Sequence, residues 1–340
     1  MVIKRLALSC AAFLVFACGR DSKPSPSQAS SSAGAAPAEK SPTPAASGPT
    51  PNGSPPKRLT SLPLSAYATS LAMDDDAVYL LTSHAAYRLV DGEPAHGIGL
   101  ELGIGPVLTR SSFVFWSNGI IWSAPKEGGV TRELAKFPHQ PQYFVGYEDA
   151  FAWVDQAEDG LYTIQTLDKR KPRVLVSSTG ELRALDMVGN AVYFVQRPAD
   201  DSWRIGSVRL DGGAVDYGTT RKGRAPSQLA GLDGVYYYDL DTTRIMKATL
   251  DLRHEEVQSK ELVCSPIHVS NRIYCGCVEG LFDVTKDTHQ PRVLVYNRPG
   301  SITNVTSNSK AVAWVVDVGA DQLAVDMLPV SEGEAQAPVP

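Results

Sequence analysis

The sequence predicts an all-β fold, a seven-bladed β-propeller with four-stranded antiparallel blades. The first observation is a short hydrophobic block, rich in aromatic residues, that occurs seven times. The copies follow one another at intervals of 36 to 43 residues, and a period near forty residues made of short strands is typical of propellers. Between the blocks, alternating and short continuous apolar runs are separated by Gly, Asp-Gly and Pro turns, with no sustained helical period. The copies are residues 77–80, 113–116, 150–153, 191–195, 234–237, 272–275 and 311–314.

Each repeat divides into four expected strands. An inner strand, such as residues 185–187, precedes the block, and a tight turn leads into the block as the second strand. A third strand, such as residues 204–210, and an outer strand, such as residues 173–176, complete the blade. Because neighbouring blades cover both faces of the second strand, its aromatic side chains are expected to be core residues rather than a ligand-binding cage.

The two ends of the folded region are expected to share one blade. The seventh repeat has an inner strand near residues 302–306, a block at 311–316 and a third strand at 322–328, but no fourth strand follows. We therefore predict that residues 58–64 supply the outer strand of the last blade and close the ring, which would remove an exposed sheet edge. Pro63 is compatible with an outermost strand.

The N-terminus has the features of an export signal. Lys4 and Arg5 precede an apolar run, residues 6–17, that is too short to span a bilayer as a mature helix. The run ends in the sequence LVFAC, which resembles the lipobox of bacterial lipoproteins. The resemblance implies a signal peptide at residues 1–17, lipidation of Cys18 and a cell-envelope location. Gly19 in place of Asp implies the outer membrane. An ordinary secretory signal and a retained membrane anchor are the alternatives.

Low-complexity sequence separates this signal from the folded region. Residues 18–57 are rich in Ser, Pro and Ala, and they contain too little apolar surface to offset the entropy of ordering. We expect a disordered tether there, a propeller over residues 58–330 and a disordered tail over 331–340. The lipid is then the only expected contact with the membrane.

Several blocks resemble a known propeller family. Residues 115–120 (FWSNGI), 152–155 (AWVD) and 236–239 (YYYD) are similar to the repeat block of YWTD and WD40-like propellers. The resemblance covers most of residues 66–328, although Cys275 occupies the Trp position in the sixth copy. It implies the fold and not an activity, because propellers host many unrelated functions.

Three cysteines cluster in the sixth repeat. If Ser270 and Asn271 form a two-residue turn, Cys264 lies opposite Cys277, and residue 266 lies opposite Cys275. In an exported protein this favours a Cys264–Cys277 disulfide, with Cys264–Cys275 as the alternative. A zinc site is a further alternative that the one-residue spacing of Cys275 and Cys277 disfavours.

Acidic residues recur in the loops that join second and third strands, which open on one face of a propeller. They predict an acidic rim that recruits a basic partner or a cation. The alternative is a set of ordinary solvated loops, and residues 221–224 (RKGR) would interrupt the rim. His139, between two prolines, is the histidine best placed for a binding or acid–base role. The acidic candidates are Asp155, Glu158, Asp159, Asp200, Asp201, Asp239, Asp241, Glu279, Asp317 and Asp321.

The motifs of the common enzyme classes are missing from the sequence. It contains no Gly-x-Ser-x-Gly elbow, phosphate loop or dinucleotide fingerprint, and no His-x-His, His-Glu-x-x-His or EF-hand pattern. The formal net charge of −5 gives no basic signature for nucleic acid. We therefore expect a non-enzymatic envelope lipoprotein without a cofactor, whose propeller binds or scaffolds another envelope protein. The alternatives are a propeller enzyme of the lyase or lactonase type, or a receptor for a small ligand or cation on the acidic face.

Overall fold

The structure is a computed structural model, and the residues that it describes all lie in the compact unit Thr50–Pro340. Every regular element in them is a β-strand, and none is a helix long and apolar enough to cross a membrane. The described residues are 56–63, 68–82, 85–98, 104–199, 201–259, 267–269, 272–276, 280–284, 292–296, 302–319 and 322–330.

Within the described ranges the strands form seven antiparallel sheets, which we number from the N-terminal side by their inner strands. Sheet 1 contains β2 (Ala68–Met73), β3 (Val78–Thr82), β4 (Ala86–Leu89) and β5 (His96–Gly97). Sheet 2 contains β6 (Ile104–Leu108), β7 (Ser112–Ser117), β8 (Ile120–Pro125) and β9 (Arg132–Lys136). Sheet 3 contains β10 (Tyr143–Tyr147), β11 (Ala150–Gln156), β12 (Tyr162–Asp168) and β13 (Lys171–Ser178).

Sheet 4 contains β14 (Glu181–Val188), β15 (Ala191–Ala199), β16 (Ser202–Arg209) and two short strands that both pair with β16, β17 (Asp216–Tyr217) and β18 (Arg221–Lys222). Sheet 5 contains β19 (Leu229–Gly231), β20 (Val235–Asp239), β21 (Arg244–Ala248) and β22 (Glu255–Ser259). Sheet 6 contains β23 (Ile267–Val269), β24 (Ile273–Gly276), β25 (Gly280–Asp283) and β26 (Arg292–Tyr296). Sheet 7 contains β27 (Ile302–Ser307), β28 (Ala311–Gly319), β29 (Gln322–Pro329) and β1 (Lys57–Pro63).

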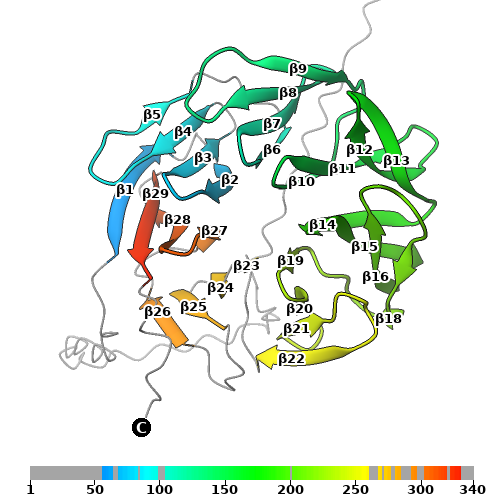
Figure 1. Cartoon of the computed structure of the whole chain (residues 1–340). Helices are drawn as coiled ribbons and strands as arrows, with labels where there is room; N and C mark the ends of the chain where they lie inside the picture. Colours follow the sequence, from blue (N-terminus) through cyan, green and yellow to red (C-terminus); the bar gives the residue numbers. More distant parts are fainter. Residues whose placement is uncertain are drawn as a thin grey trace, which may run out of the picture. The chain divides into compact units, whose positions relative to one another are not determined.

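The sheets are arranged as blades. Figure 1 shows them side by side around a common centre, with their inner strands nearest to it. Inner strands of successive sheets contact one another from β2 to β27, and β27 also contacts β2. The chain is thus an all-β propeller with four-stranded antiparallel blades, as the repeats predict.

The segment predicted to join the last blade lies there. β1 is antiparallel to β29, with Lys57 opposite Met327 and Pro63 opposite Gln322, and Figure 1 shows the two ends of the described chain side by side. Arg58 donates to both carboxylate oxygens of Asp326, from Nε at 2.8 Å and from Nη2 at 3.1 Å. The outer edge of β29 is therefore covered by a strand from the other end of the unit.

The aromatic blocks form the core between blades, as predicted. Trp153, Phe194 and Tyr237 on second strands are fully buried. The buried residues fall into clusters that each join two sheets adjacent in chain order, and one further cluster joins sheet 7 to sheet 1. Large planar side chains on the second strand fill the space between blades, where both faces of the strand are covered.

Antiparallel order gives each sheet two distinct ends. The turns between inner and second strands, such as residues 74–77, 109–112 and 148–149, lie at one end, which we call the turn face. The connections between second and third strands lie at the opposite end, which we call the loop face. The predicted acidic residues belong to the loop face.

Candidate functional site

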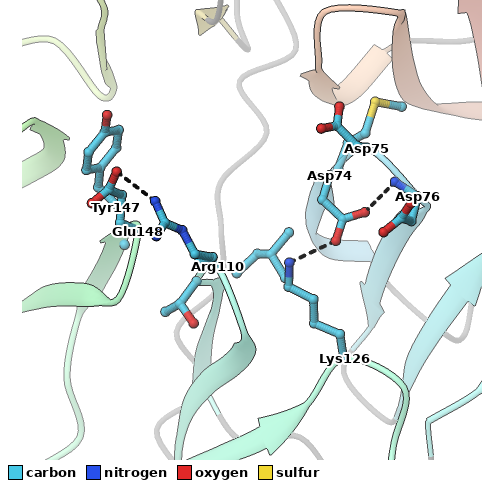
Figure 2. A pocket seen from close by; sticks show the side chains of 11 residues that line it. Asp74, Asp75, Asp76, Arg110, Lys126, Tyr147 and Glu148 are labelled. Carbon is cyan, nitrogen blue, oxygen red and sulfur yellow. Dashed lines mark hydrogen bonds and ion pairs between the residues drawn. The ribbon is translucent and has the colours of Figure 1, made fainter.

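A pocket of about 500 Å³ opens on the turn face between sheets 1, 2 and 3. Figure 2 shows charged side chains from neighbouring turns converging on it, with Asp74, Asp75 and Asp76 on one side and Tyr147 and Glu148 on the other. Its lining residues are Met73, Asp74, Asp75, Asp76, Leu108, Thr109, Arg110, Lys126, Gly146, Tyr147 and Glu148.

Asp74 holds one wall of the pocket together. The backbone N–H groups of Asp76 and Ala77 donate to its Oδ1 at 2.9 and 3.0 Å. The Tyr79 hydroxyl and the Lys126 ammonium donate to its Oδ2 at 3.1 and 2.8 Å. Burial alone would raise the pKa of Asp74, but these hydrogen bonds outweigh it and hold that pKa below its usual range. Asp74 is therefore a structural anion with little capacity left for a ligand.

Asp75 and Asp76 are placed differently, because the turn that Asp74 fixes projects them outward. Both residues are exposed. Among the described residues, the Asp75 carboxylate forms one ion pair, a distant one of 3.9 Å with the exposed Lys310. A pair of this kind contributes little free energy. These two carboxylates carry the unbalanced negative charge of the pocket.

The opposite wall is made by sheets 2 and 3. The backbone N–H of Arg110 donates to the carbonyl of Glu148 at 2.7 Å, which ties the two turns together. Glu148 adopts a φ of +51°, an uncommon conformation for a residue with a side chain. The side-chain pair of Arg110 and Glu148 spans 3.1 Å, and both members are more than half exposed, so it can open at little free-energy cost. Tyr147, 45% exposed, supplies an aromatic surface beside them.

This pocket was not predicted from the sequence. The predicted acidic face lies at the other end of the sheets, and the local signal for the pocket is the run of three aspartates, residues 74–76. The residues of the opposite wall come from distant turns. Arg110 lies 35 residues after Asp75 in the sequence, and Glu148 lies 73 residues after it. Only the packing of three blades brings them together.

On the loop face, the predicted acidic residues that the structure describes differ in their surroundings. Asp239 and Asp241 are engaged by Arg221 and Arg224 of the segment that was expected to interrupt the rim, at 3.8 and 3.1 Å. Asp155 is buried beside His139. Glu158 and Asp159 are exposed, and so is Asp201, whose carbonyl accepts a hydrogen bond from the N–H of Gly223. Asp317 is partly buried at the end of β28. Asp200, Glu279 and Asp321 lie outside the described residues.

His139 reaches the predicted loop face. Its Nδ1 lies 3.3 Å from Oδ2 of Asp155, and its ring meets the edge of Phe137 with centroids 6.0 Å apart. Among the residues that the structure describes, no three His, Cys, Asp or Glu side chains are grouped so as to hold a metal ion.

Asp186 on β14 is an acid outside the set predicted from the sequence. Its carboxylate accepts hydrogen bonds from the backbone N–H groups of Met187 at 2.8 Å and of Gly231 at 2.5 Å. Gly231 lies on β19, so the second bond crosses from sheet 4 to sheet 5. Burial raises the pKa of Asp186 to about 6, because it exceeds the opposing effect of the two hydrogen bonds.

Stability is expected to rise when Asp186 takes up a proton. Because its pKa is higher in the folded state than the ordinary value of 3.8, the folded chain binds this proton more tightly than the unfolded chain. Lowering the pH from about 7 to about 5 should therefore raise the free energy of unfolding by about 1 kcal/mol through this group. Urea denaturation of the wild type and of Asp186→Asn at both pH values measures the effect. An identical pH dependence in the two proteins would contradict it.

The cysteine register differs from the prediction. Ile267 lies opposite Cys275, whereas the predicted two-residue turn placed residue 266 there. The turn between β23 and β24 is one residue longer than predicted, and this shift removes the argument that set Cys264 opposite Cys277. Cys275 is fully buried on β24. Cys18, Cys264 and Cys277 lie outside the described residues, so the lipidation and the pairing remain predictions.

Comparisons with known proteins bear on the fold alone. No protein-family model matches the chain, and no curated protein matches it. The WD40 domain of Neurospora crassa Pan2 is 10% identical and has a TM-score of 0.57, over 81% of this chain and 96% of that one. The computationally designed Ika8 protein is 15% identical and has a TM-score of 0.51, over 77% of this chain and 83% of that one.

A gluconolactonase from Xanthomonas campestris is 12% identical, over 80% of this chain and 99% of that one. Its TM-score of 0.47 is too low to support an argument about activity. The similarity of the first two structures shows that the chain has a β-propeller fold.

Proposed function

We propose that this chain is a non-enzymatic lipoprotein of the bacterial cell envelope whose propeller binds another envelope protein through the pocket on the turn face. The observation that carries the proposal is the pocket itself, which combines exposed charges of both signs with an exposed aromatic ring. Exposed Tyr and Arg side chains of this kind are enriched where proteins bind one another. The N-terminal sequence ending at Cys18 supports the lipid anchor and an outer-membrane location.

The charge of the pocket favours a basic partner segment. Lys126 is paired with Asp74, and Arg110 with Glu148. The remaining lining charges are the carboxylates of Asp75 and Asp76. A Lys or Arg side chain of the partner would meet these carboxylates, while an apolar neighbour packs on Tyr147.

The proposal includes a ring of seven blades closed by β1. It is supported by the pairing of β1 with β29 and by the buried cluster between sheets 7 and 1. A closed ring would hold the turns of sheets 1, 2 and 3 at fixed spacing. The pocket would then be preformed, which lowers the entropic cost of binding.

Photocrosslinking tests the binding role. A photoreactive residue at position 147 of the full chain, in its native envelope, should capture one partner. The same residue at Tyr217, an exposed tyrosine on β17 of sheet 4, is the matched control and should not. The double variant Asp75→Lys/Asp76→Lys should weaken capture roughly tenfold or more, because it reverses the charges that meet the partner. Glu256→Lys, on the exposed outer strand β22, should leave it unchanged.

Equal capture at positions 147 and 217 would overturn the proposal, and so would capture that survives charge reversal in the pocket. Turnover of a small substrate with no captured partner would favour an enzyme instead.

We also propose that the sixth blade contains a disulfide formed by Cys275 with Cys264. The proposal is supported by the burial of Cys275 on β24, in the same repeat as Cys264. Peptide mapping under non-reducing conditions should recover residue 275 in a linked peptide that reduction separates. A linked peptide in which Cys264 is joined to Cys277, with residue 275 alkylated as a free thiol, would refute this pairing.

A further inference from the structure

Asp155 on the loop face has a carboxylate oxygen without a partner. The residue is only 5% exposed. Its Oδ2 accepts a hydrogen bond from Nε2 of Gln165 at 3.2 Å and lies 3.3 Å from Nδ1 of His139. Its Oδ1 is buried and has no hydrogen-bond donor within the described part of the chain. Leaving a buried acceptor unpaired costs about 1–3 kcal/mol, and more when it is charged, so such atoms call for a specific explanation.

The equivalent acid of sheet 5 provides an internal comparison. Asp239 follows Tyr237-Tyr238 as Asp155 follows Trp153-Val154, so the two occupy the same place in the repeat. Oδ1 of Asp239 accepts from the backbone N–H groups of Asp241 and Thr242, at 2.9 and 3.3 Å. Its Oδ2 faces the guanidinium of Arg221 at 3.8 Å. In sheet 5 the chain supplies its own guanidinium, whereas no Lys or Arg ion pair to Asp155 exists among the described residues.

His139 contacts Asp155 through Oδ2 and does not supply the missing donor to Oδ1. The imidazole is held on the loop between β9 and β10, where Pro138 and Pro141 restrict the backbone. Its side chain is 46% exposed, and its contact with the carboxylate is long. Rotation of this one side chain would release its contact with Oδ2 of Asp155, while Gln165 would continue to hold that oxygen.

The surrounding charge favours a cation. Glu158 and Asp159 lie on the connection that follows β11, and both are exposed. Asp159 accepts a hydrogen bond from the backbone N–H of Leu161, and neither acid forms a salt bridge within the described segments. Fixed carboxylates of one sign around a partly buried site raise the local concentration of cations.

We propose that Asp155 is the anchor of a binding site for the guanidinium group of an arginine side chain, and that His139 is its displaceable cover. A guanidinium presents two parallel N–H donors, which match the two oxygens of a carboxylate. Its binding satisfies Oδ1 and replaces the long contact from His139. The site lies at the opposite end of the sheets from the pocket, so it is independent of the function proposed above.

A pair of small probes tests this site on the full chain. N-acetyl-arginine amide carries the guanidinium as its only charge, and N-acetyl-citrulline amide has nearly the same shape without the charge. The ring signals of His139 are followed by NMR during titration. The arginine probe should shift them saturably, and the citrulline probe should not. N-acetyl-lysine amide should bind more weakly, because an ammonium does not form the bidentate pair.

Two variants locate the effect. His139→Ala removes the cover and should bind the arginine probe a few-fold to about tenfold more tightly, because a hydrogen-bonded group no longer has to be displaced. Asp155→Asn removes the anchor and should abolish the response, with the wild-type amide spectrum elsewhere showing that the variant is folded.

Three results would each overturn the site. The first is an equal response to the arginine and citrulline probes, and the second is binding that persists in folded Asp155→Asn. The third is the absence of arginine-probe binding in both the wild type and His139→Ala, which decides the question even if Asp155→Asn does not fold. None of them affects the outcome of crosslinking at position 147, because that site lies on the turn face.

Discussion

Replacing Trp153 with alanine is expected to lower the free energy of unfolding by about 3–5 kcal/mol. The indole is fully buried on β11, between sheets 2 and 3. It stacks on Phe144 and Phe151, with ring centroids 5.8 and 5.9 Å apart, and meets the edge of Phe137 at 5.2 Å. Truncation would leave a cavity that these rings cannot fill, because they are held by the backbones of two different blades. Urea denaturation followed by circular dichroism measures the change.

Two variants serve as controls for this prediction. Trp153→Phe keeps a ring in the cluster and should lose clearly less stability than the alanine variant. Tyr147→Ala removes an exposed ring from the neighbouring strand β10 and should change the free energy of unfolding by no more than about 0.5 kcal/mol. A loss below about 1 kcal/mol in Trp153→Ala would show that the space between blades 2 and 3 repacks freely.

Deleting residues 57–63 is expected to destabilise the fold by about 4 kcal/mol or more. The deletion removes the hydrogen bonds between β1 and β29 and the contact of Leu59 with the cluster between sheets 7 and 1. It also exposes the edge of β29, and unpaired edges promote association between chains. Thermal and urea unfolding should show the loss, and light scattering should show aggregation below the wild-type melting temperature.

Arg58→Ala separates the strand from its most visible side-chain contact. The side chain of Arg58 is 48% exposed, so its ion pair with Asp326 should contribute less than about 1 kcal/mol. If the deletion lowered the free energy of unfolding no more than Arg58→Ala does, the pairing of β1 with β29 would contribute little to stability, contrary to this prediction.

The propeller could be predicted from the sequence because its signals are local and repeated. The aromatic block marks the second strand of each blade, and residues such as Trp153 and Phe194 are buried where the pattern places them. The pairing of an N-terminal strand with the last blade could also be predicted, over residues 58–64, because the seventh repeat lacks a fourth strand at its C-terminal end. In both cases the need to cover apolar surface or a sheet edge leaves few arrangements open.

The register of the hairpin formed by β23 and β24 could not be predicted in the same way. The turn before β24 is one residue longer than its Ser-Asn sequence predicts, so Ile267 rather than residue 266 lies opposite Cys275. A shift by one residue changes which cysteine can be bridged, because side chains alternate between the faces of a strand.

What the sequence determined by itself is therefore the blade, its aromatic core and the strand that completes the last sheet. The tertiary structure decided the candidate sites. Asp155 and Asp239 are equivalent in the repeat, yet one contacts His139 and the other faces Arg221, because each partner comes from a segment outside the block. Asp75, Arg110 and Glu148 stand on three different blades and share one pocket. Repeats are governed by contacts close in sequence, whereas sites are made where side chains of separate blades meet.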